Sequence, residues 1–275
     1  MRRRWLYPLA GHGVILLLLA LFMAPILWML STSLKPDNEL FTEEIRWIPQ
    51  RIAWENYQQA LTTFPFWLYL RNTLIIAVLT AVGTVLSCLP PAYAFARMRW
   101  RGRNFWFWVM LSTLMLPPQV TLLPVFLLFR WLGWVDTFLP LIVPAFLGNA
   151  FLIFMLRQFF ITLPQELIDA AKLDGCSEWT ILWRLVAPMS KPAVATIALF
   201  SFVWAWTDFM GPLIYLNDSS KFTLAVGLQY FLGRHGEQWN LLMAAATVVT
   251  APLVMLFLIT QRAYVRGITL TGLKG

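Results

Sequence analysis

Charged side chains are scarce in this chain. Only 12% of its 275 residues are Asp, Glu, Lys or Arg, whereas 59% are hydrophobic. Ordinary soluble domains are about a quarter charged, so roughly half of the usual charge is missing. This shortage excludes an ordinary water-soluble fold and indicates that the lipid bilayer is the solvent around most of the chain.

Cysteine and histidine are also rare, with two of each. Cys88 lies in an apolar run and Cys176 in a polar loop, so they predict neither a disulfide framework nor a paired metal site. His12 and His235 lie near the expected membrane surfaces with no second ligand nearby, and we therefore expect no metal. A membrane enzyme would need a cluster of His, Asp, Glu or Cys on its spans, so we expect no catalytic residues.

A Gly-x-x-x-x-Gly-Lys-Ser/Thr phosphate loop is missing from the sequence as well. We therefore expect no cofactor on this chain, and any ATP that drives it is bound by another chain. The formal net charge of +8 could suggest a nucleic-acid partner. Its basic residues form short clusters between apolar runs, however, and we expect no binding to nucleic acid.

Long uncharged runs are what the sequence has in place of charge. A membrane helix needs about 20 apolar residues. The runs predict an all-α membrane protein with six transmembrane helices, at residues 11–34, 71–96, 105–130, 137–157, 191–216 and 239–262. Asn56–Leu70 is short and rich in Gln and Thr, and we interpret it as an interfacial helix within an outer loop, 35–70. The first run is too long for a signal peptide and no small-x-small cleavage site follows it, so we expect it to be retained.

Lys and Arg predict the orientation of these spans. If the N-terminus is cytoplasmic, 14 of the 21 basic residues lie in or directly beside the inner segments, residues 1–10, 97–104, 158–190 and 263–275. Eight of the 13 acidic residues then lie in outer segments such as 35–70 and 217–238. By the positive-inside rule both termini are cytoplasmic, which agrees with an even number of crossings.

The inner segment 158–190 has the signals of two short helices. Pro164 suits the start of the first helix and Glu166 the positive end of its dipole. Gly175 offers a left-handed stop, and Ser177 can cap a second helix that continues to Pro188. One face of the first helix carries Leu167, Ala170, Ala171 and Asp174. A helix of about ten residues needs a partner in water, so it docks either in a groove of another protein or on its own membrane domain.

This segment resembles the EAA loop of ABC importer permeases. The matching residues are Asp169-Ala170-Ala171, Asp174-Gly175-Cys176 and Val186-Ala187-Pro188. Asp169 stands where the family has Glu, and Cys176 where Ala is usual. Further segments are similar to the carbohydrate-importer permeases that include the second inner-membrane subunit of maltose transporters: Arg71-Asn72-Thr73, Ala92–Arg97, Met115–Val120, Phe154–Phe160, Trp206–Phe209 and Gly272–Gly275. Thr207 replaces the usual Asn.

The resemblance implies a type I ABC importer permease architecture, in which the loop is a cytoplasmic coupling helix seated in a separate ATPase. It implies that the ATPase contacts are Glu166, Asp169, Ala170, Ala171, Asp174, Gly175, Lys274 and Gly275. The implied partners are a second permease subunit in a heterodimer, a dimer of ATP-binding subunits that holds ATP and magnesium, and an extracytoplasmic solute-binding protein. The implied location is the bacterial cytoplasmic (inner) membrane, and the implied cargo an oligosaccharide.

Four residues are candidates for the substrate pathway: Asn149, Trp204, Thr207 and Asp208. An ionisable residue in a span, such as Asp208, is a functional candidate, although it can also anchor the helix at the outer interface. Asn149 can hydrogen-bond a sugar or a neighbouring helix, and a Trp can stack on a sugar or anchor a helix end. A monosaccharide or a glycerol-phosphate-type solute, and a secondary transporter instead of an ATP-driven importer, stay open as alternatives.

Overall fold

A computed structural model describes residues 6–42, 46–232 and 238–272, and every element in these ranges is a helix. Lys274 and Gly275, two of the expected ATPase contacts, lie outside the described residues. The chain divides into two compact units, Met1–Trp67 with Gly227–Pro252, and Leu68–Val226 with Leu253–Gly275.

The first unit contains a long apolar helix whose burial is confined to its end. Helix α1 (Leu6–Ser33) is exposed along residues 12–23, whereas Thr32 and Ser33 are buried. Asn56, from helix α2 (Glu55–Thr62), is buried and donates to the carbonyl oxygens of Ser33 (2.9 Å) and Lys35 (2.8 Å). These bonds satisfy carbonyls that a helix end leaves without partners. Helix α2 ends at Thr62, so residues 66–70, expected in the interfacial helix, are instead the first turns of the next helix.

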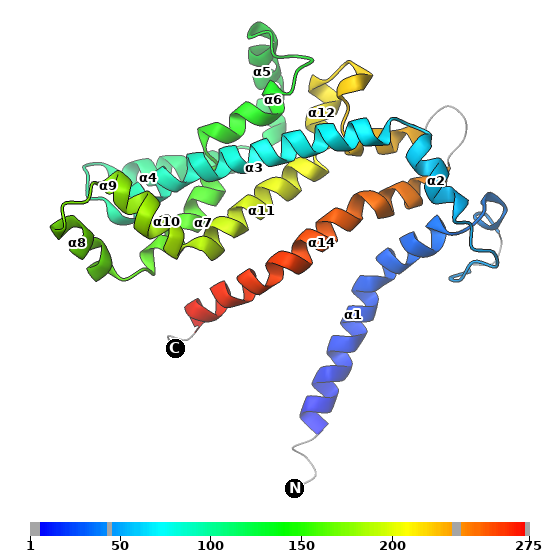
Figure 1. Cartoon of the computed structure of the whole chain (residues 1–275), viewed down its shortest axis with the longest axis horizontal. Coiled ribbons are helices and arrows are strands. Elements are labelled where there is room, and N and C mark those ends of the chain that lie inside the picture. The colour runs from blue at the N-terminus through cyan, green and yellow to red at the C-terminus, as the bar shows by residue number, and fades with distance from the viewer. Residues whose placement is uncertain (1–5, 43–45, 233–237, 273–275) are drawn as a thin grey trace. The chain divides into compact units, whose positions relative to one another are not determined.

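The second unit is built around helix α3 (Phe66–Arg97), from Leu68 onward. The elements that follow are α4 (Arg103–Ser112), η3 (Thr113–Met115), α5 (Pro118–Trp131), α6 (Leu139–Ile142), η4 (Val143–Leu147), α7 (Ala150–Ile161), α8 (Gln165–Leu173), α9 (Glu178–Ile181), η5 (Leu182–Val186), α10 (Ala187–Met189), α11 (Lys191–Thr207), α12 (Met210–Tyr215), η6 (Ser219–Lys221), α13 (Leu224–Gly227), η7 (Leu228–Leu232) and α14 (Trp239–Gly272). Figure 1 shows α8, α9 and α10 together at one end of α3. Helices η7 and the first part of α14 belong to the first unit.

Three of the expected spans are broken and not single straight helices. The chain bends by 96° between Arg103–Met115 and Pro118–Trp131, because Leu116 and Pro117 are extended and a residue before proline avoids the helical region. The span expected at 137–157 is interrupted at Gly148, whose φ is +90°. The span expected at 191–216 is interrupted at Asp208, which is extended. Within the described residues four helices are long and apolar enough to cross a membrane, and Leu139–Ile161 counts among them despite its break at Gly148. The number rises to six when each of two bent pairs counts as one span: the pair just described, and Glu178–Met189 with Lys191–Thr207, which are bent by 85°.

The core of the second unit joins the loop helices to the membrane helices. It contains Leu89 and Tyr93 from α3, and Leu152, Leu156 and Phe160 from one face of α7. The remaining members are Cys88, Ala92, Ile153, Ile168, Ile181, Leu182, Val186 and Ile197. Because Ile168 and Ile181 come from the expected cytoplasmic loop, this loop is packed on the second unit and is not a free connection.

Candidate functional site

A cavity of about 600 Å³ opens within the second unit. Its wall comes from α3, from α6 and η4, from the start of α7, and from α11 and α12. The lining residues are Ile76, Thr80, Thr84, Leu141, Pro144, Ala145, Gly148, Asn149, Leu152, Ser201, Trp204, Ala205, Thr207, Asp208 and Pro212. All four residues that the sequence analysis selected for the substrate pathway lie in this wall.

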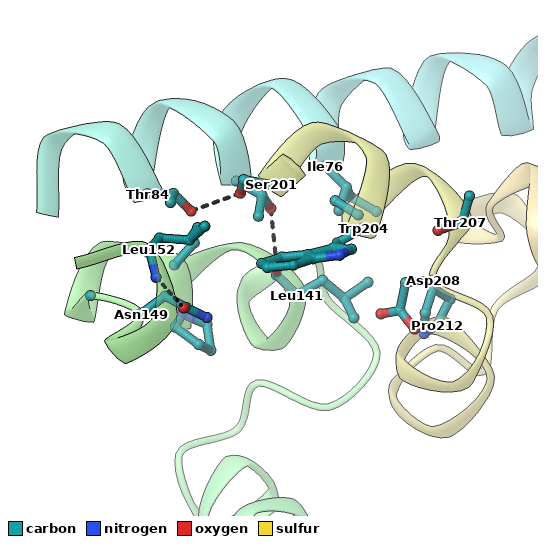
Figure 2. A pocket seen from close by; sticks show the side chains of 15 residues that line it. Ile76, Thr84, Leu141, Asn149, Leu152, Ser201, Trp204, Thr207, Asp208 and Pro212 are labelled. Atoms are coloured by element: carbon teal, nitrogen blue, oxygen red, sulfur yellow. Dashed lines mark hydrogen bonds between the residues drawn. The ribbon is translucent and has the colours of Figure 1, made fainter. Parts of the chain in front are cut away.

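The indole of Trp204 lies in the cavity wall between Asn149 and Asp208 (Figure 2). It is 48% exposed and stacks on Phe200, with 6.0 Å between the ring centroids. An indole face is flat and apolar, whereas its N–H is a hydrogen-bond donor. Trp204 therefore offers the cavity a surface on which a ring can lie.

Asn149 and Asp208 both serve the local backbone at breaks in the helices. The Oδ1 atom of Asn149 accepts from the backbone N of Leu152 (3.1 Å) and caps the start of α7. The Oδ1 atom of Asp208 accepts from the backbone N of Gly211 (3.0 Å). A Cβ atom at Gly211 would lie 2.3 Å from the other oxygen of Asp208, so only glycine leaves room for this carboxylate. The breaks in the two spans thus fix these polar groups at the cavity wall.

Sequence reasoning selected Thr207 but missed three other hydroxyl residues of the wall, Thr80, Thr84 and Ser201. The Oγ1 of Thr84 and the Oγ of Ser201 form a buried hydrogen bond of 2.7 Å that joins α3 to α11. Thr80, one turn before Thr84, donates to the carbonyl oxygen of Leu141 (3.3 Å). Thr80 and Thr84 stand at i and i+4 within an apolar stretch of α3 and therefore lie on one face of the helix, and this spacing was the signal available in the sequence.

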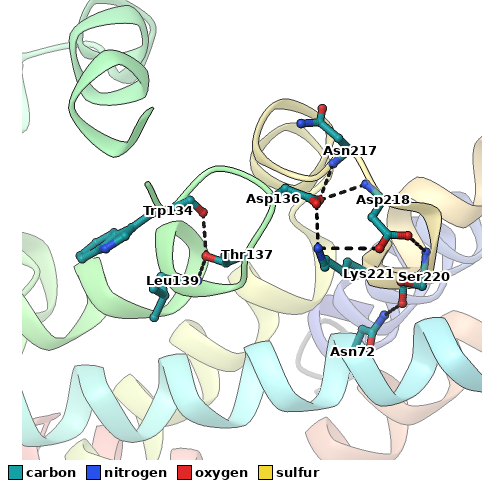
Figure 3. A network of polar contacts seen from close by, with 9 residues as sticks. All are labelled: Asn72, Trp134, Asp136, Thr137, Leu139, Asn217, Asp218, Ser220 and Lys221. Atoms are coloured by element: carbon teal, nitrogen blue, oxygen red, sulfur yellow. Dashed lines mark hydrogen bonds and ion pairs between the residues drawn. The ribbon is translucent and has the colours of Figure 1, made fainter. Parts of the chain in front are cut away.

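A second polar cluster lies where two loops of the second unit meet (Figure 3). Asp136 has a left-handed backbone, with φ of +62°. Its Oδ1 accepts from the backbone N atoms of Asn217 and Asp218, both at 3.0 Å, and its Oδ2 lies 2.7 Å from Nζ of Lys221. The hydrogen bond from Lys221 lowers the pKa of the Asp136 carboxyl to about 2, and the two backbone amides act in the same direction. One carboxylate therefore ties residue 136 to the loop after α12.

Helix α3 is joined to that loop by two further side chains. Asn72 donates to the carbonyl oxygens of Ser220 (2.9 Å) and Phe222 (3.0 Å). Thr73 is fully buried, and its hydroxyl accepts from the backbone N of Leu224 (2.9 Å). The segment from 217 to 224 is thus held on both sides by hydrogen bonds.

Helix α8 ends as its sequence predicts. Gly175 has φ of +79°, which confirms the expected left-handed stop. The backbone N of Gly175 donates to the carbonyl oxygen of Lys172, and that of Cys176 to Ala171, both at 3.0 Å. These two bonds form a Schellman motif. The next expectation is also confirmed, because Ser177 Oγ accepts from the backbone N of Thr180 (3.2 Å) at the start of α9.

The expected docking face of α8 is only partly outward. Ile168 is 1% exposed and packs in the core, and Ala171 is partly buried beside it. Leu167, Ala170 and Asp174 are exposed, together with Glu166 and Asp169. Ala171 lies on the inner side because a helix of this length needs its own apolar anchor, which the face chosen from the sequence did not include.

Asp169 is held within its own helix, where its Oδ1 accepts from the side-chain amide of Gln165 (2.9 Å). No group of three or more His, Cys, Asp or Glu side chains that could hold a metal ion occurs among the described residues. The described residues thus form a cavity within the second unit and an exposed side of α8 that carries Glu166, Asp169 and Asp174.

The chain is similar to a known family and to characterised transport proteins. Residues 90–270 match the family described as "Binding-protein-dependent transport system inner membrane component". The chain is 32% identical over 254 residues to the arabinooligosaccharides transport system permease protein of Halalkalibacterium halodurans, covering 91% of each chain. It is also 32% identical over 264 residues to the sn-glycerol-3-phosphate transport system permease protein of Yersinia pestis, covering 93% of this chain and 92% of that one.

A solved structure has the same fold. It is a chain from a bacterial ABC transporter involved in the import of the acidic polysaccharide alginate, with a TM-score of 0.83 and 24% identity. The match covers 95% of this chain and 98% of that one. The chain thus has the fold of a type I ABC importer permease, and it belongs to the family of inner membrane components of binding-protein-dependent transport systems.

Proposed function

We propose that this chain is one of two permease subunits of an ATP-driven importer for neutral oligosaccharides. It crosses the bacterial inner membrane six times with both termini in the cytoplasm, and pairs with a second permease subunit. A dimer of ATP-binding subunits supplies ATP and magnesium, and an extracytoplasmic binding protein delivers the sugar. Membership of the family sets aside a secondary transporter and a membrane enzyme.

The composition of the cavity wall carries this proposal. Sugars are recognised by hydroxyl, amide and carboxylate groups together with a flat apolar surface, and the wall contains each of them. Hydroxyls come from Thr80, Thr84 and Thr207, the amide from Asn149 and the flat surface from Trp204. Alternating access of this cavity to the two sides of the membrane would then carry the sugar across.

The charge of the wall supports a neutral cargo. Asp208 is the one ionisable residue among the described residues that line the cavity, and none of them is Lys, Arg or His. A carboxylate without a facing cation repels an anionic solute in a medium of low dielectric constant. The relatives carry both types of cargo by name, neutral arabinooligosaccharides and sn-glycerol 3-phosphate. The wall therefore favours the first over the second.

The outward side of α8 supports the coupling role. Leu173 is 90% exposed and Trp179, just after the corner at Gly175, is 63% exposed. Large exposed apolar side chains on the same loop as the exposed carboxylates of Glu166 and Asp174 are what a basic, partly apolar groove in another protein would bind. The Asp169, Ala170, Ala171 and Gly175 positions are assigned to the same contact by the family pattern, as are Lys274 and Gly275.

The test uses the complex purified through this chain and reconstituted in proteoliposomes with its binding protein. Uptake of arabinotriose and of sn-glycerol 3-phosphate is measured for the wild type and for Asp208→Asn. The Asn side chain keeps the bond to Gly211 but removes the charge, so we expect uptake of the anion relative to the sugar to rise about tenfold. Asp218→Asn, a matched loss of charge outside the cavity, should leave the ratio unchanged.

Two results would contradict the proposal. A purified complex without an ATP-binding subunit would contradict the importer function as a whole. A wild-type complex that imports sn-glycerol 3-phosphate in preference to arabinotriose would contradict the neutral cargo alone and support the glycerol-phosphate alternative.

A further inference from the structure

The corner between α8 and α9 is bridged by a charged pair. Lys172, in the last turn of α8, lies 2.6 Å through its Nζ from Oε1 of Glu178, in the first turn of α9. A cation at the C-terminus of one helix and an anion at the N-terminus of the next are each favoured by the helix dipole. The two side chains are 39% and 38% exposed, however, and an exposed ion pair by itself contributes little to stability.

A buried group from α3 completes the bridge. Tyr93 is 2% exposed, and its hydroxyl donates to the second oxygen of Glu178, Oε2, at 2.6 Å. The ring lies in the core of the second unit with Leu89, Ile168 and Ile181. A hydrogen bond from a buried hydroxyl to an ionised carboxylate is shorter and stronger than a neutral one. Glu178 thus joins α8, α9 and α3 at a single side chain.

A second anchor lies at the other end of α8. Arg97, the last residue of α3, donates to the carbonyl oxygens of Phe160 and Leu163 and to Oε1 of Gln165 (2.7 Å). The amide of Gln165 in turn donates to Asp169. Both ends of α8 are therefore bonded to the last turns of the same membrane helix, α3.

We propose that Tyr93, Glu178 and Lys172 form a latch that makes α8 and α3 move as one body, so that displacement of α8 by the ATPase is passed to the cavity wall. Thr84 and Thr80 of this wall belong to α3, about two and a half and three and a half turns before Tyr93. Tyr93 and Glu178 are positioning residues that touch no solute. The inference rests on the proposed coupling function of α8.

Removing the hydroxyl of Tyr93 distinguishes the role of the latch from that of ordinary core packing. Tyr93→Phe leaves the ring in the core and removes only the bond to Glu178, so the complex should still fold and assemble. When α8 moves without α3, ATP hydrolysis no longer depends on the state of the cavity. We expect ATP hydrolysis in the absence of the binding protein to rise about tenfold, the change that one charge-assisted hydrogen bond supports.

The experiment uses the full complex in proteoliposomes, with two measurements. The first is the rate of ATP hydrolysis without and with the binding protein. The second is the mobility of a spin label on Cys176, which is exposed directly after α8, whereas Cys88 is buried and does not react. We expect Tyr93→Phe to raise both the basal rate and the mobility of the label.

Tyr57→Phe is the matched control, because it removes a hydroxyl that bonds Ser33 (2.8 Å) in the first unit. It should leave both measurements at wild-type values. Glu178→Lys should uncouple the complex more strongly, and Glu178→Lys with Lys172→Glu should recover part of the coupling, because a pair of opposite charges is restored and Tyr93 can accept from Lys.

The outcomes separate this inference from the proposed function. If the wild type couples hydrolysis to the binding protein and Tyr93→Phe does so equally, with an unchanged label, the latch is wrong and the coupling helix stands. If Tyr93→Phe and Tyr57→Phe raise basal hydrolysis equally, the effect is general loosening and the latch is also wrong. If the wild type contains no ATPase, the proposed function itself fails.

Discussion

At the scale of single residues, the polar side chains of the spans are held at points where the helices break. Asn149 and Asp208 were selected from the sequence because an amide or a carboxylate in an apolar run is costly to retain. Their capping bonds could not be predicted, because they depend on breaks that the hydropathy of the runs does not reveal. The hydroxyls of Thr84 and Ser201 were missed for another reason: a hydroxyl in a helix usually bonds its own backbone.

Asp136 gives a prediction at this scale. Its pKa of about 2 in the folded chain lies below the ordinary 3.8, so its bonds contribute to stability above pH 3.8 and are lost as the pH falls through about 2. In Asp136→Asn the left-handed backbone is tolerated, since Asn adopts it readily, but the charge is gone. We expect the variant to unfold at a lower temperature than the wild type, with a constant difference from about pH 7 to about pH 5 that narrows below about pH 4.

Thermal unfolding of the purified protein followed against pH checks this prediction. Asp218→Asn is a useful comparison, because its side chain bonds Ser220 within one loop, whereas Asp136 joins two loops. If the difference in unfolding temperature between the wild type and Asp136→Asn stays unchanged down to the lowest pH, the charge of the carboxylate contributes nothing to stability.

At the scale of elements, local signals predicted the loop helices better than the spans. Pro164, Gly175 and Ser177 act on neighbouring backbone groups, so the ends of α8 and the start of α9 could be read directly. The buried side of α8 could not be predicted in this way. Whether Ile168 or Leu167 is buried depends on how α8 packs in the core with residues of α3 and α7. The bend near Leu116 lies at Pro117 and Pro118, but its angle of 96° depends on how the two helices pack and could not be predicted from the sequence.

Gly175 gives a prediction at this scale. Nothing lies within 4 Å of a Cβ atom built there, so Gly175→Ala meets no clash and the whole effect comes from the left-handed backbone. We expect the free energy of opening at the amides of Gly175 and Cys176 to fall by about 1–2 kcal/mol, measured by hydrogen exchange.

Gly133→Ala is the matched control, with φ of +70° and equally open surroundings in another loop. It should lower protection around its own position and leave coupling of ATP hydrolysis unchanged, whereas Gly175→Ala should weaken coupling. Gly175→Asn should lie between Gly175→Ala and the wild type, because Asn tolerates the left-handed region. Equal coupling in the two Ala variants would argue against a special role for the α8 corner.

At the scale of the whole molecule, charge and hydropathy carried most of the prediction. The family, the all-helical fold and the presence of several membrane-crossing helices could be predicted, since each follows from composition or from a continuous motif. The cavity could not, because its wall is drawn from positions 76 to 212 and exists only after those segments pack.

The proposed orientation gives a prediction at this scale. Cys176 is exposed and lies in the expected cytoplasmic loop, and Cys88 is buried. A maleimide that cannot cross membranes should label Cys176 in inside-out vesicles and leave right-side-out vesicles unlabelled. An Asp218→Cys substitution, on the expected outer side, should give the opposite pattern in a Cys176→Ala background. Labelling of Cys176 from outside would reverse the proposed topology.

Along residues 12–33, helix α1 is packed against the rest of its unit only at its C-terminal end, and this determines which substitutions along the helix should be tolerated. Residues 12–23 are exposed along the whole helix surface, and burial begins only near Thr32 and Ser33, where Asn56 closes the helix end. The first half of α1 therefore needs only hydrophobic side chains, whereas its last turn needs particular side chains for this unit to fold. Libraries of variants should tolerate exchanges among Leu, Ile, Val and Phe freely at the start of the helix and reject most replacements from Ser33 to Lys35.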